Sequence, residues 1–518
     1  MAKICLSLTG KTIAEDIELL DKNRKYADAA ELRVDCLDPD ERFLIRRFPE
    51  MAGLPVILTI RREIDGGNYT GAEGSRIKIF ADGLAYADAD RRRNFAYVDL
   101  EDDLDIPSLE EAARTFGTRI IRSRYNMDGV DDDLAGILRQ MRRVGDELVK
   151  AVITPHTLND VIKVYRAARE TMDIEKIITC MGEYGGLTGI LAEFMGSRFC
   201  YASAGMEPPD GSAATGQLKP GDLVQFYRFR KITGKTKIFA VAGFPLITAA
   251  SPRFFNTVFE SEKADAVFVS VTAGSVHDLM RFAKEIGLSG ITVTVPYKEE
   301  ILPYLKFKSP EVITTGACNI VVADTEQTIG NDRMPGRVSH PGEWRGYNTD
   351  AACFSASLLS FLGRKDLRGR RLTIVGAGGT ARSAAAEIYR LKGNALILNR
   401  TSSKARSLAS QYRFAWAGLD SHGADLMSRY SDIIIQASSA GMEPHQNEDP
   451  LEFYRFTGRE TVMDLIYKPE MTRCLKRAEE AGCRILNGYD MLTRQARMQY
   501  GYFMNKEFPP SLVSRIKF

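Results

Sequence analysis

One lysine stands inside an apolar run, Leu148-Val149-Lys150-Ala151-Val152-Ile153. A lysine flanked by β-favouring apolar residues is unsuited to a solvated surface, and burial by itself lowers the pKa of an ammonium group. A neutral amine is what attack on a ketone to form a Schiff base requires. The run therefore predicts a buried strand that carries a nucleophilic lysine.

Three charged side chains alternate with two apolar ones in Glu31-Leu32-Arg33-Val34-Asp35. Because successive side chains of a strand point to opposite faces, the three charges share one face. In a solvated sheet that face would be an ordinary outer surface, whereas in a barrel it points inward, where unpaired charge is costly. With Arg61 at the end of another β-favouring run, these residues form a candidate site if the elements close into a barrel.

Short β-favouring runs recur through the first half of the chain, with room for a helix between them. Alternating strands and helices predict a parallel sheet, and eight units in about 220 residues are typical of a (β/α)8 barrel, whose sites lie at the carboxyl ends of the strands. An open flavodoxin-like sheet is the alternative, but it would need fewer strands. The predicted strands are 4–8, 30–34, 56–60, 95–100, 119–123, 148–153, 177–181 and 199–203.

A second chemical signal is a glycine loop after a predicted strand, 372–375, and before a helix-favouring stretch, 382–390. Glycines permit a tight turn and close backbone approach, and the helix amino terminus favours a pyrophosphate. The position between strand and helix favours dinucleotide binding over a plain strand-to-helix turn. The loop residues assigned to the cofactor are Gly376, Ala377, Gly378, Gly379, Thr380 and Ala381.

The next predicted strand, 395–398, ends in Asn399-Arg400-Thr401, and Lys404 follows closely. An NAD site usually ends this strand with an acid for the ribose 2′-hydroxyl, whereas an arginine pairs with a 2′-phosphate. A solvated helix start is disfavoured because positive charge at a helix amino terminus opposes the helix dipole. The cofactor predicted is NADP.

Composition restricts the partners. The 518 residues exceed one usual core, and 70 basic against 68 acidic side chains leave a net charge of +2, which predicts small-molecule substrates and neither nucleic acid nor a membrane surface as partner. Eight scattered cysteines without CxxC spacing predict reduced thiols and no metal site. The sequence starts without a leader pattern and has no apolar run of about 20 residues, so we expect a cytoplasmic protein.

The first half resembles the type I 3-dehydroquinate dehydratases. The matching pieces are Glu31-Leu32-Arg33-Val34-Asp35, Thr59-Ile60-Arg61 with Asp65-Gly66-Gly67, Val149-Lys150, Met181-Gly182-Glu183 and Gly216-Gln217. The resemblance implies that Lys150 forms an imine with the C3 ketone of 3-dehydroquinate, and that Glu31, Arg33, Arg61 and Gln217 bind the substrate.

Three positions depart from that family's pattern. Tyr125 stands where the family has a histidine acid/base, Gly189 replaces a substrate-binding arginine, and Ala213 replaces a serine. A tyrosine with a pKa of about 10 is a poor proton shuttle at neutral pH. His156 is one possible compensation at the barrel mouth, and a capping or loop histidine before the next helix is the alternative.

The second half is similar to shikimate dehydrogenase, through an ordered set of motifs. The pieces are Ala250-Ser251-Pro252, Thr292-Val293-Thr294-Val295-Pro296-Tyr297-Lys298, Gly316-Ala317-Cys318-Asn319, Gly346-Tyr347-Asn348-Thr349-Asp350, Ala440-Gly441-Met442, Asp464-Leu465-Ile466-Tyr467-Lys468-Pro469 and Gly488-Tyr489-Asp490-Met491-Leu492 with Gln495. The resemblance makes Lys298 and Asp350 catalytic, gives Ser251, Thr294, Asn319, Tyr467 and Gln495 to the substrate, and adds Gly488 to the cofactor site. Ala249 stands where the family has the first serine of a carboxylate clamp.

The Pro, Gly and basic residues of 219–237 indicate a boundary between the halves. We therefore expect an α/β protein with a (β/α)8 barrel at 1–222 and a two-lobed dehydrogenase after it. Its lobes would be a substrate-binding domain at 238–350 and a Rossmann NADP-binding domain at 351–518, with the last helices returning to the substrate domain.

Two consecutive activities on one chain, 3-dehydroquinate to 3-dehydroshikimate and then to shikimate with NADPH, are the leading hypothesis. Tyr125, Gly189 and Ala213 motivate a second hypothesis, in which only the dehydrogenase is active and the barrel is a scaffold or binding module. Ala249 motivates a third, in which the dehydrogenase prefers quinate.

Overall fold

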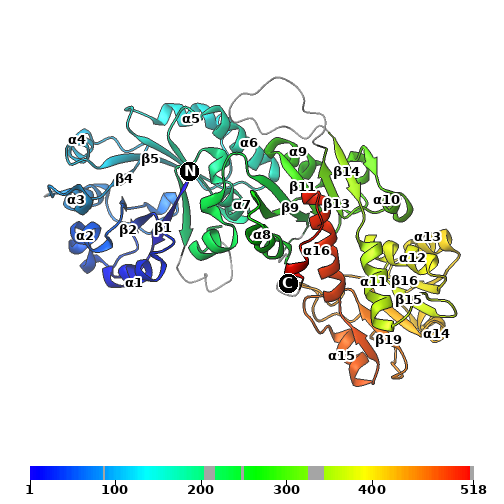
Figure 1. Cartoon of the computed structure of the whole chain (residues 1–518). Helices are drawn as coiled ribbons and strands as arrows, with labels where there is room; N and C mark the ends of the chain where they lie inside the picture. The colour runs from blue at the N-terminus through cyan, green and yellow to red at the C-terminus, as the bar shows by residue number, and fades with distance from the viewer. Residues whose placement is uncertain (86–87, 204–215, 245, 247–249, 325–342, 514–518) are drawn as a thin grey trace.

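The computed structural model describes residues 1–85, 88–203, 216–244, 246, 250–324 and 343–513. Three sheets follow one another along an elongated molecule, from the barrel at one end to the yellow and orange sheet at the other (Figure 1). Ala213 and Ala249 lie outside the described residues. Within these ranges, none of the helices combines the length and the apolar character needed to span a membrane.

The first sheet is a near-closed barrel of eight parallel strands, as predicted. Strand β8 pairs with β1, and a bridge between Lys176 and Ser197 joins the β7 side to the segment before β8. The strands are β1 Lys3–Leu8, β2 Ala29–Arg33, β3 Val56–Thr59, β4 Tyr97–Glu101, β5 Arg119–Asn126, β6 Leu148–Ile153, β7 Lys176–Cys180 and β8 Phe199–Ser203. The helices are α1 Ile13–Asn23, α2 Phe48–Ala52, α3 Glu73–Leu84, α4 Pro107–Thr115, α5 Leu134–Met141, α6 Leu158–Glu170 and α7 Gly185–Ile190.

The barrel interior has an apolar floor with a charged layer above it. Side chains such as Cys5, Ile121 and Tyr201 form the floor near the amino-terminal ends of the strands. Glu31 and Lys150 lie nearer the carboxyl ends, and each is only 1% exposed. Because the apolar residues between the charges pack outward against the helices, the charged face of β2 points inward, which confirms the barrel reading of that segment.

The linker is more ordered than its composition indicated. Two short helical turns, Asp222–Phe226 and Phe229–Lys231, lie within it. Leu223 and Phe229 are buried in a hydrophobic cluster that continues into the middle sheet. Apolar residues spaced among Pro, Gly and basic residues therefore anchor the segment instead of leaving it as a free tether.

The middle sheet is mixed, with strand order β10-β9-β11-β13-β14-β12. Its parallel strands β9, β10 and β11 end on one edge, so the residues that follow them gather there. The strands are β9 Lys237–Gly243, β10 Ala266–Thr272, β11 Leu288–Val293, β12 Phe307–Lys308, β13 Ile320–Ala323 and β14 Trp344–Tyr347. The helices are α8 Ser251–Ser261, α9 Val276–Ile286 and α10 Pro310–Thr315.

The third sheet is parallel throughout, with order β17-β16-β15-β18-β19-β20, the pattern expected of a dinucleotide-binding domain. The glycine loop follows the central strand β15, where the strand order reverses. The strands are β15 Arg371–Val375, β16 Asn394–Leu398, β17 Ala415–Ala417, β18 Ile433–Gln436, β19 Thr461–Asp464 and β20 Arg484–Leu486. The helices are α11 Asp350–Leu362, α12 Gly379–Arg390, α13 Ser402–Tyr412, α14 Ser421–Met427, α15 Arg473–Glu480 and α16 Tyr489–Met504.

The barrel and the middle sheet are joined by helices α6 and α9, which lie side by side (Figure 1). The Asn159 amide donates to Asp278 Oδ1 at 2.6 Å, and Arg281 donates to Asn159 Oδ1 at 3.1 Å. Arg166 pairs with Glu285 across the same interface. Because buried apolar residues from both sides form one cluster, the two halves pack against each other.

The last long helix, α16, returns from the third sheet to the middle sheet and packs on α8, β11 and β13. Phe503 enters the apolar cluster beside Phe239 and Phe255. Gly290 of β11 lies directly beneath its ring, because a Cβ there would come within 2.7 Å of two ring carbons. The absence of a side chain at this glycine therefore permits the return of α16.

We expect Gly290→Ala to lower the free energy of unfolding by about 1–3 kcal/mol, since the added methyl overpacks the contact with Phe503. Urea denaturation followed by circular dichroism measures the change. Gly274→Ala is the matched control, because a Cβ there would meet no atom within 4 Å. Equal stabilities for the two variants would contradict this packing.

Candidate active sites

A cavity of about 300 Å³ lies between the middle and third sheets. Residues from the ends of β9, β11 and β19 line it together with the glycine-loop helix and α16. The predicted site residues among its lining are Ser251, Thr294, Lys298, Asn319, Asp350, Thr380, Tyr467, Gly488 and Gln495. The structure therefore brings together residues that the sequence scatters over more than 240 positions.

A lysine and a carboxylate meet at the centre of this cavity. Lys298 Nζ donates to Asp350 Oδ2 at 2.5 Å and to Thr380 Oγ1 at 3.1 Å. The other oxygen of Asp350 accepts from Asn319 Nδ2 at 2.5 Å and from Gln495 Nε2 at 2.6 Å. Asp350 is fully buried, and each of these hydrogen bonds places a donor on its carboxylate, so both of its oxygens have partners.

Local sequence explains why Asp350 is held there. It is the first residue of α11, where the helix dipole favours a negative charge, and its N–H donates to Asn348 Oδ1 at 2.9 Å. The Asn348 amide in turn donates to the Ala317 carbonyl at 2.8 Å. In the segment before β13, the Cys318 N–H donates to the Lys298 carbonyl at 2.7 Å. The backbone on both sides of the lysine-aspartate pair is thus fixed by hydrogen bonds.

The glycine loop fits a dinucleotide pyrophosphate. Gly376 has a φ of 117°, and a Cβ there would come within 2.8 Å of the Ala437 carbonyl oxygen, so a side chain is excluded. A Cβ at Gly378 would meet nothing within 4 Å, which leaves that backbone open to a ligand. No side chain caps the first turn of α12, whose N–H groups are therefore available to an anion.

The residues predicted for the 2′-phosphate follow β16. The Asn399 side chain donates to the Thr401 carbonyl at 3.0 Å and shapes the turn into α13. Arg400, Thr401 and Lys404 are exposed around this turn. A cationic surface at the end of this strand suits a 2′-phosphate.

The barrel holds a second buried lysine. Lys150 Nζ donates to Asp99 Oδ2 at 2.6 Å and to Glu31 Oε1 at 3.2 Å. Glu31 also accepts from Ser7 at 2.6 Å and lies 3.5 Å from Arg61. Asp99 was not singled out in the sequence, although it occupies an alternating position in β4 like that of Glu31 in β2.

The expectation that Lys150 has a lowered pKa is wrong, because these two carboxylates stabilise its ammonium form. Burial does oppose the ammonium form, but Asp99 and then Glu31 outweigh it and raise the pKa of Lys150 well above its usual value. Burial likewise opposes the ionised form of Glu31, yet Lys150 and Arg61 lower the pKa of Glu31 far below its usual range. The pair is thus fully charged at neutral pH, and Lys150 needs a proton acceptor before it can act as a nucleophile.

Tyr125 faces the same charged layer. Its ring centroid lies 4.7 Å from the Arg61 guanidinium and 5.8 Å from Lys150 Nζ. Burial raises the pKa of Tyr125 although Arg61 opposes the shift, so the phenol keeps its proton at neutral pH. Arg33 is engaged by Asp35 through two hydrogen bonds of 2.9 and 2.6 Å. In this site Tyr125 is suited to donating a hydrogen bond more than to accepting a proton.

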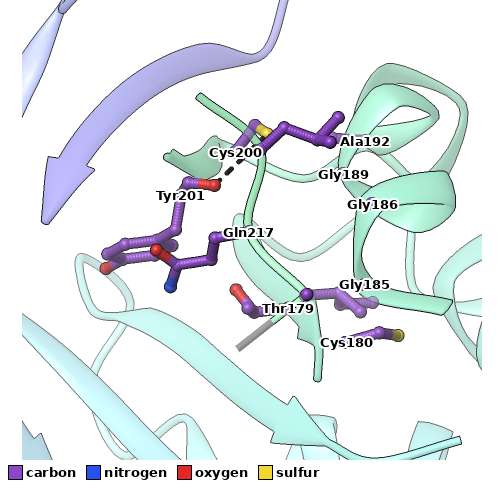
Figure 2. A pocket seen from close by; sticks show the side chains of 12 residues that line it. Thr179, Cys180, Gly185, Gly186, Gly189, Ala192, Cys200, Tyr201 and Gln217 are labelled. Carbon is purple, nitrogen blue, oxygen red and sulfur yellow. Dashed lines mark hydrogen bonds between the residues drawn. The ribbon is translucent and has the colours of Figure 1, made fainter. Parts of the chain in front are cut away.

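A small cavity of about 20 Å³ opens beside this layer, between α7 and the last two strands (Figure 2). Gly189 borders it, and a Cβ there would lie 3.4 Å from Cys200 Sγ. Thr179, Tyr201 and Gln217 supply its polar groups, and every residue that lines it is uncharged. Tyr201, whose ring lies 4.6 Å from Lys150 Nζ, was missed in the sequence, although β8 alternation places it inward.

His156 does not join the charged layer. Its ring Nε2 is 3.0 Å from the Asp128 carbonyl oxygen, and its backbone N–H donates to Asp160 Oδ2 at 3.2 Å. The residue is exposed just before α6, so its described contacts are those of a loop histidine. Among the described residues, no group of three or more His, Cys, Asp or Glu side chains could hold a metal ion.

Fold and site together define a two-lobed dinucleotide-dependent dehydrogenase joined to a barrel with a buried lysine. Three family models match successive parts of the chain. The model described as type I 3-dehydroquinase matches residues 4–234, the shikimate dehydrogenase substrate binding domain matches 241–321, and shikimate / quinate 5-dehydrogenase matches 360–461.

Individual proteins are similar to all or part of the chain. The chain is 25% identical to a chloroplastic bifunctional 3-dehydroquinate dehydratase/shikimate dehydrogenase of Arabidopsis thaliana, covering 95% of this chain and 80% of that one. A shikimate dehydrogenase (NADP(+)) of Caldanaerobacter subterraneus is 31% identical, covering 54% of this chain and 96% of that one. A solved structure, dehydroquinate dehydratase and shikimate dehydrogenase from S. pombe AroM, is 21% identical with a TM-score of 0.41, covering 99% of this chain and 97% of that one.

The chain therefore belongs to the bifunctional 3-dehydroquinate dehydratase/shikimate dehydrogenase family, in which a lyase is fused to an oxidoreductase.

Proposed function

We propose that the barrel dehydrates 3-dehydroquinate to 3-dehydroshikimate and that the second half reduces this product to shikimate with NADPH. The observation that carries the proposal is the Lys298–Asp350 pair in a cavity that faces the glycine loop. Such a pair places a proton donor beside the site where a hydride acceptor would bind. The shared intermediate gives a chemical reason for joining both sites on one chain.

When bound, NADPH supplies a hydride to the C3 carbonyl carbon of 3-dehydroshikimate. Lys298 donates the proton that the developing alkoxide oxygen needs, and Asp350 orients its ammonium. Asn319 and Gln495 hold the Asp350 carboxylate, a positioning contribution in addition to their proposed contacts with substrate. Ser251, Thr294 and Tyr467 line the same cavity and are proposed to bind the substrate carboxylate and hydroxyls.

We propose NADP as the cofactor, bound by residues 376–381 and Gly488 at the pyrophosphate and nicotinamide side and by 399–401 with Lys404 at the 2′-phosphate. The uncapped start of α12 and the cations after β16 support this assignment. The Caldanaerobacter relative is also named as an NADP(+) enzyme.

In the barrel, Lys150 first passes a proton to Asp99, whose Oδ2 lies 2.6 Å away. The neutral amine then attacks the C3 carbonyl of 3-dehydroquinate, and loss of water gives an imine that acidifies the C2 hydrogen. The C1 hydroxyl leaves as water, the C2 proton restores the group that protonated it, and hydrolysis of the imine frees 3-dehydroshikimate and Lys150. Arg33, Arg61 and Gln217 are proposed to bind the substrate, and Tyr125 to donate its proton to the leaving hydroxyl.

A second candidate function makes the barrel a scaffold or binding module for an active dehydrogenase. The ion pairs that keep Lys150 charged and the raised pKa of Tyr125 favour this reading, because both oppose the proton transfers that elimination needs. The alternative with quinate as preferred substrate depends on Ala249, which lies outside the described residues.

The binding partners and the location in the cell are also proposals. A net charge of +2 supports small-molecule substrates without a nucleic-acid partner. We propose a cytoplasmic location from the sequence pattern alone.

We expect Lys298→Ala and Asp350→Ala each to lower kcat for 3-dehydroshikimate reduction by more than about 100-fold, because proton donation and its orientation are lost. NADPH binding, followed by fluorescence titration, should stay within about twofold. Lys306→Ala, an exposed lysine paired with Glu343 on the same sheet, is the control. Near-normal turnover in either site variant would exclude this role.

We expect the wild-type enzyme to prefer NADPH, and Arg400→Ala to reduce the ratio of kcat/KM for NADPH to that for NADH by about tenfold, since a charge-assisted contact is lost. Arg390→Ala, which removes an exposed arginine paired with Glu387 in the same domain, should leave the ratio unchanged. A wild-type enzyme equally efficient with both cofactors would contradict the assignment.

We expect borohydride with 3-dehydroquinate to trap an adduct on Lys150, detected by intact mass, and Lys150→Ala to abolish it. Asp99→Asn removes the proposed proton acceptor of Lys150, so the rate of trapping at pH 7 should fall by at least about tenfold. In the wild type, trapping should accelerate as pH rises. Asp103→Asn, largely exposed and paired with Arg62, is the control. Absence of any wild-type adduct would favour the scaffold reading.

A further inference from the structure

Two tyrosines from different halves of the chain donate to consecutive carbonyl groups, one at the end of β10 and one at the start of the loop after it. Tyr297, which precedes Lys298, donates its hydroxyl to the Ala273 carbonyl. Tyr184 of the barrel donates to the Thr272 carbonyl at 3.4 Å. The two rings are buried, with 3% and 5% of their surfaces exposed. The loop after β10 therefore lies between the barrel and the dehydrogenase lysine.

This loop is fixed by the same elements that join the two halves. The Ala273 N–H donates to the Gly243 carbonyl at 3.2 Å, at the end of β9. Two residues further on, Ser275 caps α9 by accepting from the Asp278 N–H at 3.0 Å. Asp278 also accepts from Asn159 of the barrel. The position of the loop thus depends on the packing of α9 against α6.

Tyr297 connects this loop to the turn that carries Lys298. Its N–H donates to the Thr294 carbonyl at 3.0 Å, which closes the turn, while its hydroxyl reaches the Ala273 carbonyl. The Cys318 N–H holds the Lys298 carbonyl from the opposite side. These contacts hold the backbone on both sides of Lys298, which fixes the point and direction from which its side chain extends toward Asp350.

Tyr184 belongs to the barrel segment that borders the barrel's own site. It ends the short turn Gly182–Tyr184 after β7, and Gly185 next to it lines the small cavity of Figure 2. One barrel segment therefore contacts the barrel cavity on one side and the loop that anchors Tyr297 on the other.

We propose that Tyr297 and Tyr184 are positioning residues for Lys298, with the barrel holding the loop, the loop holding Tyr297, and Tyr297 orienting the lysine toward Asp350. This inference rests on the proposed function of Lys298. Neither tyrosine lines the large cavity, so each acts through the backbone and through Lys298. The barrel thereby supports the dehydrogenase whether or not it turns over its own substrate.

The test uses the full-length chain with 3-dehydroshikimate and NADPH, and compares Tyr297→Phe, Tyr184→Phe and the double variant. We expect kcat to fall by about tenfold and about threefold in the single variants, with both KM values nearly unchanged, because the reacting geometry changes and the binding surfaces do not. Because both hydroxyls act through one loop, the double variant should be about as slow as Tyr297→Phe alone.

The matched control is Tyr69→Phe, a buried barrel tyrosine that donates to the Ala72 carbonyl at 3.3 Å on another loop. Its dehydrogenase kcat should equal that of the wild type. Wild-type kcat in Tyr297→Phe, multiplicative losses in the double variant, or losses that appear in KM would each overturn the proposal. An inactive wild type would instead refute the proposed function itself, so the two failures are distinguishable.

Discussion

An ammonium group that is largely removed from water needs a carboxylate partner, and both sites of this protein are built around that requirement. Lys298 is paired with Asp350 at 2.5 Å, and Lys150 is paired with Asp99 at 2.6 Å and with Glu31 at 3.2 Å. In the dehydrogenase the charged form is the useful one, because reduction of a ketone needs a proton donor. In the barrel the same kind of pairing opposes the proposed imine formation, which needs the neutral amine. Removal of the proton from Lys150 is therefore the costly first step of the proposed dehydration.

Local patterns were sufficient for the architecture and for the inward-facing charges of β2. Period-two alternation placed Glu31 and Arg33 on an inward face, and the eight strand-helix units predicted a barrel, because these signals depend on neighbouring residues. The charge state of Lys150 could not be read in this way. It depends on Asp99, which is 51 positions away and meets the lysine only when β4 and β6 share the barrel interior.

The interface between the halves could not be predicted from the sequence either. Asn159 and Asp278 are 119 positions apart, and each taken alone is an ordinary polar residue near the start of a helix. A shared intermediate would by itself explain the fusion without any contact between the halves, yet α6 packs against α9 and Tyr184 donates to the last carbonyl of β10. A contact that supports the dehydrogenase gives the barrel a physical role in addition to any turnover of its own.

A coupled assay shows whether one chain performs both consecutive reactions. The purified protein is supplied with 3-dehydroquinate and NADPH, while the enone absorbance of 3-dehydroshikimate and the loss of NADPH are followed together. We expect NADPH to be oxidised without added 3-dehydroshikimate, and Lys150→Ala to stop this oxidation but leave the reduction of supplied 3-dehydroshikimate intact. Oxidation of NADPH only when 3-dehydroshikimate is supplied to the wild type would contradict this expectation.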